Sequence, residues 1–182
     1  MTILHTDRLR LEPFAEAHLE GLHAMNRLPE VMRYISGQPE TREQTAAGIA
    51  RVQRAWSVLG TSWWAFVDAA GGVVGAGCIQ YIRREAAPPE DLASLRGNPL
   101  EIGWRLHPDH QGKGLAIEAA RRMAAFAFED LATPELIAVR HPDNIASGRV
   151  MDRLGMRYRG LEAWYGLELA THAMGRGTWT GK

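Results

Sequence analysis

Apolar and polar positions alternate in some stretches of the chain and recur at helical spacing in others. Arg8–Phe14 alternates charged and apolar residues, which predicts a half-buried strand. Three helices are expected next, over Ala15–Asn26, over Pro29–Ile35 and from Thr41 to about Leu59. Thr41 and Gln44 have the spacing of a capping box, and Gly60 is the expected helix stop.

The segment Trp63–Ile82 is long enough to resemble a membrane span, because its only charged residue is Asp68. Its middle, however, reads Asp68-Ala69-Ala70-Gly71-Gly72, which is turn chemistry. Aromatic and β-branched residues flank this turn on both sides. The pattern therefore favours a hairpin with strands at Ser62–Asp68 and Val73–Tyr81, and we expect no membrane partner.

The second half of the chain predicts further strand and helix units. A surface loop is expected at Arg83–Pro99, with a helical turn near Asp91–Leu95. In the strand Leu100–Leu106, apolar residues occupy one face and charged residues the other. The other expected elements are helices at Gly112–Glu129 and Ala146–Leu154, and strands at Leu136–Val139, Met156–Ala163 and Leu167–Arg176. This order predicts one mixed α/β (α+β) domain over residues 1–182.

Composition narrows the class of protein. Of 182 residues, 46% are hydrophobic, and 21 basic residues balance 21 acidic ones, which argues against a nucleic-acid binder that relies on bulk charge. The single cysteine, Cys78, allows no internal disulfide. Charged residues arrive too early for a signal peptide, so a cytoplasmic protein is expected.

The segment with the most chemistry is Gln111-Gly112-Lys113-Gly114-Leu115-Ala116, which lies between an expected strand and an expected helix. Its three small residues let backbone N–H groups approach a ligand, and a helix N-terminus favours an anion. The segment fits neither a P-loop nor the dinucleotide fingerprint, because His107 and Ile117 stand where glycines are required. A phosphate loop of a third kind and a chance glycine-rich helix start are the two interpretations that remain.

Gln111, Gly114 and Ala116 meet the pattern Gln/Arg-x-x-Gly-x-Gly/Ala, which resembles the pyrophosphate loop of the GCN5-related N-acetyltransferase (GNAT) superfamily. The surroundings are similar to the RimJ/RimL-type subgroup, which acetylates protein N-termini and small amines. The similar segments are Thr6–Leu11, Pro29–Met32, Gly71–Gly77, Glu101–Trp104, Pro108–Ala119, Asn144–Ser147 and Met151–Met156. The loop Arg83–Pro99 is the least typical part.

This resemblance implies a curved, mostly antiparallel sheet that splays between a central parallel pair and is flanked by helices. Acetyl-CoA would lie in the cleft as a co-substrate, without a metal. A free strand edge at Trp104–Leu106 would pair with the pantetheine amides. Asn144 would either bond to the cofactor arm or cap its helix. The cofactor-binding candidates are Leu106, Gln111, Gly112, Lys113, Gly114, Leu115, Ala116 and Asn144.

Acetyl transfer to an amine needs a base, an oxyanion donor and a proton for the departing thiolate. Glu101 is the preferred base because its strand enters the cleft, although a rim carboxylate paired with an arginine is an equal alternative. Its rivals are Glu12, Glu162 and Glu168. Many relatives carry a tyrosine that acts as the acid, and this chain has Met151 at that position. Ser147 lies one helical turn earlier on the same face, so it is either the acid or only a helix cap. The Leu106 region is the candidate oxyanion donor.

Several points stay open in the sequence. Relatives carry a glutamate where this chain has Arg159, which leaves the acceptor undefined. The acceptor is a protein N-terminal amine or a small-molecule amine, and Asn26–Gly37 and Thr41–Gly60 are expected to line its entrance. The three histidines that suggest a metal lie in proline turns, so none is expected: His107, His110 and His141. A non-catalytic CoA-binding regulatory module is the alternative function, and a homodimer is allowed.

Overall fold

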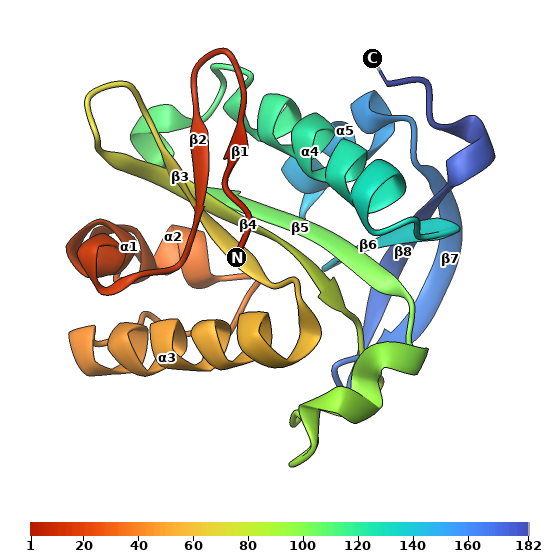
Figure 1. Ribbon diagram of the computed structural model, residues 1–182, viewed down its shortest axis with the longest axis horizontal. Helices are drawn as coiled ribbons and strands as arrows, with labels where there is room; N and C mark the ends of the chain where they lie inside the picture. Colours follow the sequence, from red (N-terminus) through yellow and green to blue (C-terminus); the bar gives the residue numbers. More distant parts are fainter. Residues whose placement is uncertain (182) are drawn as a thin grey trace.

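The computed structural model describes residues 1–181, and its centre is one eight-stranded sheet in the order β1-β2-β3-β4-β5-β6-β8-β7 (Figure 1). Neighbouring strands are antiparallel except β5 and β6, which are parallel. The strands are β1 (Leu4–His5), β2 (Arg10–Pro13), β3 (Trp63–Val67), β4 (Val73–Tyr81), β5 (Leu100–Leu106), β6 (Glu135–Arg140), β7 (Arg157–Trp164) and β8 (Leu167–Gly175). The predicted mostly antiparallel sheet with a central parallel pair is confirmed.

Helices cover both faces of this sheet (Figure 1). The helices are α1 (Leu19–Asn26), α2 (Pro29–Met32), α3 (Arg42–Leu59), α4 (Leu115–Ala125) and α5 (Ile145–Leu154). The first three pack on one face, where Leu22, Met32 and Ile49 share a core with β3 and β4. On the other face, α4 and α5 pack together through residues such as Met123 and Met151. The two faces therefore have different apolar cores, which meet at α3, where Trp56 belongs to the second core and Val52 packs against both.

Side chains of β5 alternate between these two faces, as the sequence pattern predicts. Ile102 and Leu106 belong to the core under α4. Glu101 contacts Gln80 on the opposite face, and Arg105 lies over the Trp63 ring there. The charged side chains of β5 therefore lie on the face that α1 and α3 cover.

Local signals place several boundaries correctly. The capping box of Thr41 and Gln44 is present, and α3 ends at Gly60, whose φ of 78° is left-handed. The Asp68 carboxylate accepts hydrogen bonds from the Ala70 and Gly72 N–H groups, which closes the β3–β4 hairpin. No helix within residues 1–181 is long and apolar enough to cross a membrane.

Other boundaries differ from the predictions. The helix expected over Gly112–Glu129 begins only at Leu115, because Gly112 and Gly114 adopt left-handed φ angles of 73° and 79°. Its last turn, Phe126–Asp130, is a π-helix. The two residues of β1 are too few to produce a visible alternation, and the sequence pattern missed this strand.

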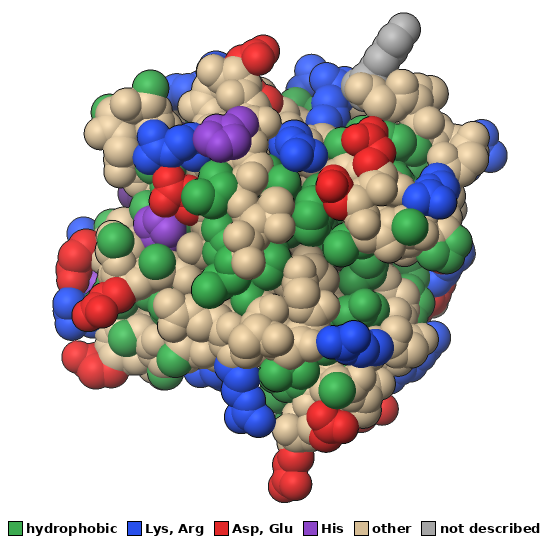
Figure 2. Space-filling model, in the orientation of Figure 1, with side chains coloured by type: hydrophobic (Ala, Val, Ile, Leu, Met, Phe, Trp, Pro, Cys, Tyr) green, Lys and Arg blue, Asp and Glu red, His purple; other side chains and the backbone are tan. Residues whose placement is uncertain are grey.

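The visible face of the molecule carries acidic and basic side chains close together rather than in patches of one sign (Figure 2). This distribution agrees with the balanced charge of the whole sequence. Long-range electrostatic steering of a ligand is therefore weak, and recognition depends on local groups.

Candidate active site

The sheet opens where its two parallel strands separate. β5 and β6 pair at only two positions, Leu100 with Leu136 and Glu101 with Ile137. Beyond these positions β5 continues along β4, whereas β6 continues along β8. One edge of β5 is consequently free over its second half, and its backbone groups can form hydrogen bonds with a ligand.

Backbone groups of β5 face this opening at alternate residues. The His107 N–H donates to the Val74 carbonyl, so this residue turns its backbone groups toward β4. Because backbone groups alternate along an antiparallel strand, those of Trp104 and Leu106 face the opposite way, into the opening. The free edge predicted at these two residues is therefore present.

The loop after β5 presents a row of free donors beside the opening. The Gln111 side chain donates to the Leu106 carbonyl at 3.3 Å, which ties the loop to the end of β5. Within the described chain, the backbone N–H groups from Gly112 to Ala116 donate to no protein acceptor. They lie at the N-terminus of α4, where the helix dipole favours an anion. The geometry suits a phosphate or pyrophosphate group.

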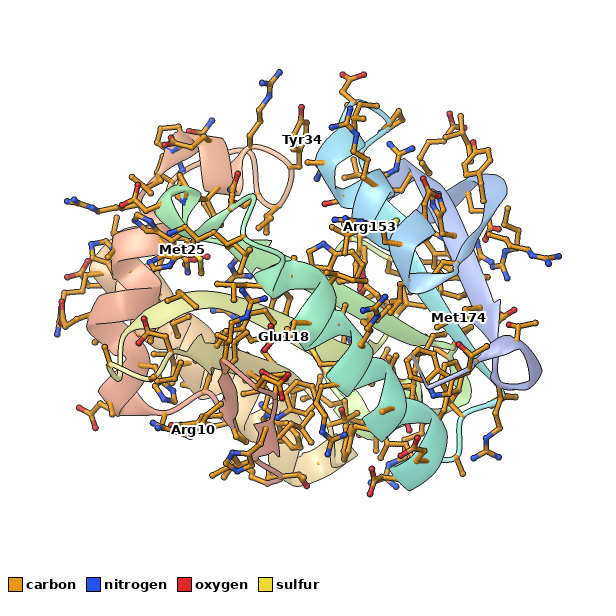
Figure 3. All side chains as sticks on the ribbon, turned by 90° about the horizontal axis from the view of Figure 1, so that it is seen from above. Arg10, Met25, Tyr34, Glu118, Arg153 and Met174 are labelled. Carbon is orange, nitrogen blue, oxygen red and sulfur yellow. The ribbon has the colours of Figure 1, made fainter. Side chains whose placement is uncertain are left out.

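Contacts from the N-terminal segment hold this loop in place. Arg8 donates to the Lys113 carbonyl at 2.9 Å and pairs at 2.6 Å with Glu118. Glu118 lies on α4 (Figure 3). The Thr6 hydroxyl donates to the same carboxylate at 2.6 Å. Burial opposes ionisation of Glu118, but the hydrogen bonds from Thr6 and Arg8 outweigh it and lower the pKa of this carboxyl. Glu118 is thus an ionised anchor for the loop.

The start of α5 forms the other side of the opening. The Asn144 side chain accepts a hydrogen bond from the Ser147 N–H at 3.2 Å, so it caps the helix, which is one of its two expected roles. The Ser147 hydroxyl has no hydrogen-bond partner among the described residues and is partly exposed. Met151, one turn later, is buried with 2% of its surface exposed.

Part of the expected acceptor entrance reaches across to this side. Tyr34, which follows α2, stacks on His141 after β6, with 5.4 Å between ring centroids. Figure 3 shows Tyr34 beside the gap that separates the α2 segment from α5. The stack joins the segment after α2 to the turn before α5.

Glu101 lies in a hydrogen-bonded cluster on the α3 side of β5. It is buried, with 7% of its surface exposed, and accepts hydrogen bonds from Gln80 at 2.9 Å and from the Tyr165 hydroxyl. Burial raises the pKa of Glu101, and the two hydrogen bonds oppose this shift. Burial and the nearby carboxylate raise the pKa of Tyr165, which therefore stays a proton donor.

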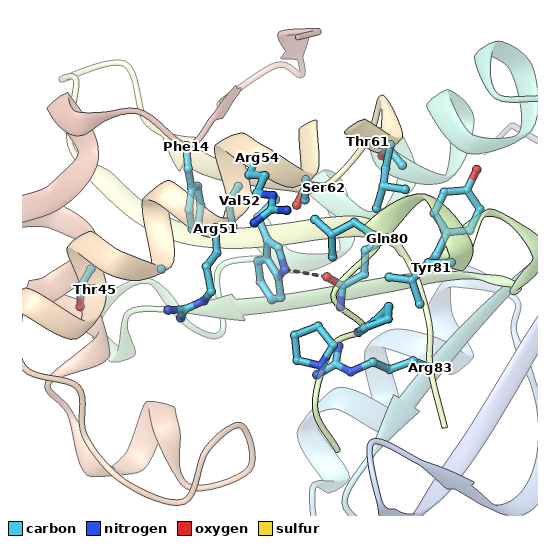
Figure 4. Close-up of a pocket in the computed structure, with 18 of the residues that line it drawn as sticks. Phe14, Thr45, Arg51, Val52, Arg54, Thr61, Ser62, Gln80, Tyr81 and Arg83 are labelled. Carbon is cyan, nitrogen blue, oxygen red and sulfur yellow. Dashed lines mark hydrogen bonds between the residues drawn. The ribbon is translucent and has the colours of Figure 1, made fainter. Parts of the chain in front are cut away.

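A cavity of about 650 Å³ lies next to this cluster, between α3, β4 and the segment that follows β4 (Figure 4). Gln80 lies on its floor and links the cavity to Glu101. The Trp63 indole donates to the Gln80 side chain at 3.0 Å, the bond drawn in Figure 4. Much of its wall comes from α3, the second segment that the sequence assigned to the acceptor side.

The rival carboxylates have other partners. Glu12 pairs with Arg10 and His18, and hydrogen bonding to Arg10 contributes most to lowering its pKa. Glu162 pairs with Arg159, the arginine that replaces the expected glutamate, and this bond lowers the pKa of Glu162. Glu168 is exposed on β8. None of the three lines the cavity, and Glu101 reaches it only through its hydrogen bond with Gln80.

The described residues give little support for a metal site or for a nucleophilic thiol. No group of three or more His, Cys, Asp or Glu side chains within residues 1–181 is arranged to hold a metal ion. The rings of His107 and His141 instead accept N–H bonds from Asp109 and Asp143 in their turns. Burial raises the pKa of the Cys78 thiol well above its usual value, so it remains protonated.

Three side chains of the site were not predictable from the sequence. Gln80, Arg105 and Tyr165 come from different strands and turns, and their spacing gives no motif. The sequence does signal a turn at Tyr165-Gly166, because this dipeptide lies between two alternating segments. In the structure both residues adopt positive φ. A turn was predictable there, but not the hydroxyl that it places on Glu101.

Comparisons with known proteins give the same result as the geometry. The family model described as an acetyltransferase (GNAT) domain matches residues 8–157. A curated relative, the FsC-acetyl coenzyme A-N(2)-transacetylase of Aspergillus fumigatus, is 32% identical over 157 residues, which are 85% of this chain but only 65% of that protein. The uncharacterized protein YkkB of Bacillus subtilis is 32% identical over 86% of both chains.

Solved structures agree in fold. An acetyltransferase of the GNAT family from Bacillus anthracis superimposes with a TM-score of 0.76 over 97% of this chain and 99% of that one, at 23% identity. Its fold matches the open sheet described above. From the family model, the relatives and this fold together, the chain belongs to the GNAT acetyltransferase family.

Proposed function

We propose that this protein transfers the acetyl group of acetyl-CoA directly to a primary amine. The observation that carries this proposal is the free edge of β5 beside a loop with five unpaired backbone donors, from Gly112 to Ala116. A pyrophosphate suits those donors, and an amide-containing arm suits a strand edge. The name of the Aspergillus relative, FsC-acetyl coenzyme A-N(2)-transacetylase, supports the same co-substrate.

Each cofactor-binding candidate has a distinct part in this proposal. Backbone N–H groups would hold the pyrophosphate, Gln111 would fix the loop to β5, and Lys113, which is exposed, would add charge. The backbone of Leu106 and its neighbour Trp104 would pair with the pantetheine arm. Asn144 uses its side-chain oxygen as a cap, which leaves its amide nitrogen to face the arm. The residues assigned to acetyl-CoA are Leu106, Gln111, Gly112, Lys113, Gly114, Leu115, Ala116 and Asn144.

The transfer itself needs no covalent enzyme intermediate. The amine nitrogen attacks the thioester carbonyl carbon, an oxyanion forms, and the carbon–sulfur bond then breaks to leave an amide and the CoA thiolate. Glu101 is assigned as the base that takes the amine proton, directly or through water. A backbone N–H near Leu106 is assigned as the donor that stabilises the oxyanion. The thiolate takes its proton from the Ser147 hydroxyl or from water.

The acceptor is a protein N-terminus or a small amine, as in the RimJ/RimL-type subgroup that the motifs resemble. Support for this subgroup comes from the segments around Glu101–Trp104 and Asn144–Ser147 rather than from the fold. A cytoplasmic location fits the single buried cysteine.

Thiol release tests the proposal against a CoA-binding module without turnover. The protein is incubated with acetyl-CoA and a panel of peptides and small amines, free thiol is followed, and the acetylated amine is identified by mass spectrometry. Calorimetry measures acetyl-CoA affinity separately. Release that depends on the amine supports the transferase, whereas tight binding of acetyl-CoA without amine-dependent release would establish the binding module instead.

A further inference from the structure

The cavity beside α3 has more positive than negative charge on its walls. Its charged lining residues are Glu40, Glu90, Arg51, Arg54, Arg83 and Arg105. None of the four arginines pairs within 4.0 Å with any carboxylate of residues 1–181. The protein therefore leaves a local excess of positive charge facing this space, although its net charge is zero.

Arg105 is the most unusual of these arginines. Its guanidinium stacks 4.6 Å from the centre of the Trp63 ring and makes no hydrogen bond to a described residue, and its buried Nε is without an acceptor. Stacking covers the flat face of a guanidinium but leaves its edge, which matches a carboxylate, free. Arg83 is arranged similarly on Tyr165, although one of its nitrogens donates to the Ala86 carbonyl.

The carboxylate of Glu40 does not neutralise Arg105. One oxygen of Glu40 accepts hydrogen bonds from Asn26 at 2.8 Å and Thr45 at 3.1 Å, and no ion pair to Arg105 forms. Burial lowers the pKa of Arg105, and Glu40 raises it from a distance. A guanidinium nevertheless stays charged near neutral pH. Holding it half-buried without a counter-ion is costly, and a bound anion removes that cost.

Arg105 also has a suitable position in the strand. It lies between Trp104 and Leu106, whose backbone groups face the opening where the thioester is proposed to lie. Its own side chain points to the other face of the sheet, into the cavity. Leu92 and Leu95, from the least typical segment of the chain, form an apolar wall that strengthens electrostatic interactions there.

We propose that the acceptor amine belongs to a molecule that also carries a carboxylate, and that Arg105 binds this carboxylate in the cavity. This inference rests on the proposed acetyl transfer and adds a substrate class to it: free amino acids and related amino carboxylates, rather than polyamines or other cationic amines. Arg105 is then a specificity-determining residue.

Matched pairs of amines test this substrate class. Each amino acid of a panel is offered both as the free acid and as its primary amide, with spermidine as a cationic comparator. We expect kcat/KM to be at least about tenfold higher for the acid than for the amide, the size expected for a charge-assisted hydrogen bond. Arg105→Gln should abolish this preference, and Arg105→Lys should restore part of it.

Two controls keep the test independent of folding and of turnover. Arg42→Gln removes the same charge from α3 at an exposed pair with Glu20 outside the cavity, and it should keep the preference. Glutarate, a dicarboxylate without an amine, should raise the melting temperature of the wild type and of Arg42→Gln but not of Arg105→Gln. Calorimetry should show unchanged acetyl-CoA affinity in both variants.

Distinct results overturn the two proposals. Equal or faster acetylation of amides and spermidine, or a preference for acids that survives Arg105→Gln, overturns the carboxylate inference and leaves the transferase in place. Acetyl-CoA binding without acetylation of any amine overturns the proposed function, and the inference with it.

Discussion

Glu101 is the proposed general base, and its surroundings adjust its pKa in a direction that suits this role. Burial raises its pKa, while Gln80 and Tyr165 donate hydrogen bonds that stabilise the carboxylate and limit the rise. A base with a raised pKa retains a proton more readily and is better matched to neutral pH. The cluster therefore tunes the carboxyl group rather than merely burying it.

Glu101→Gln should lower kcat by about 10²-fold or more, because general-base catalysis typically contributes 10²–10⁴-fold. A base works only when deprotonated, so wild-type activity should fall as pH drops through its raised pKa. This acidic limb should lie above the range of an ordinary carboxyl group and should vanish in the variant. The measurement is the pH profile of kcat with a saturating amine.

Tyr165→Phe is the matched variant for this test. It removes a hydrogen bond that lowers the pKa of Glu101, so the acidic limb should move to higher pH while activity at high pH is retained. If the limb stays in place in both variants, another group is the base.

Ser147→Ala should lower kcat by roughly tenfold, which is less than a typical general acid contributes, because water can also protonate a thiolate. The hydroxyl has no partner in the described residues, whereas its backbone N–H is held by Asn144, so the substitution leaves the helix cap intact. Steady-state kinetics on the folded variant measures this effect. A kcat equal to that of the wild type would show that the serine has only a structural role.

Distance along the chain decided which of these residues were predictable. Glu101 stood out because its strand was expected to enter the cleft. Gln80 and Tyr165 are 21 and 64 residues away from it, and only the pairing of β4 with β5 and the turn after β7 bring them together. No periodicity in one strand carries that information.

At the scale of an element, the proposed phosphate site at the N-terminus of α4 depends on how the loop before it is held. Left-handed Gly112 and Gly114 turn the backbone before the first helical residue, Leu115, so that free donors face one side. Arg8 and Glu118 hold the loop from behind without occupying those donors. The sequence motif predicted the donors, whereas the support from residues more than 100 positions away was not predictable.

Glu118→Gln should weaken acetyl-CoA binding by several-fold, although this side chain does not face the donors. The variant loses the charge that holds Arg8, and Arg8 holds the Lys113 carbonyl. Positioning groups of this kind act through the order of the loop. Calorimetry with acetyl-CoA measures the loss, and Lys113→Ala, which keeps the backbone, should change affinity less. Equal affinity in Glu118→Gln and wild type would show that the loop is ordered without this ion pair.

At the scale of the whole molecule, the sheet order was predictable only through family resemblance. Alternation located most strands, yet the parallel pairing of β5 with β6 depends on the return of the chain through α4. The cavity depends on the packing of α3 against the segment after β4, where Arg96 donates to the Val58 carbonyl. That segment has no repeating pattern, so its wall of the cavity was not predictable.

Acid should destabilise the whole fold, and Glu118 should contribute to the loss. Hydrogen bonds lower the pKa of this carboxyl in the folded state, so its contribution is present above the usual pKa and is lost as pH falls through the lowered value. Glu162 has a lowered pKa too, and its hydrogen bonds to the Arg159 side chain are the main cause. Glu101 acts in the opposite direction, because its raised pKa makes protonation favour the folded state.

We therefore expect the free energy of unfolding, measured with urea, to fall as pH drops below about 5, the range that carboxyl groups of lowered pKa control. Glu118→Gln should flatten this fall because it removes a carboxyl group of lowered pKa that accepts bonds from both Thr6 and Arg8, while Glu162→Gln, which loses only its pair with Arg159, should flatten it less. Glu101→Gln should steepen it, since the opposing group is gone. A slope that is the same in all three variants would place the acid sensitivity elsewhere in the fold.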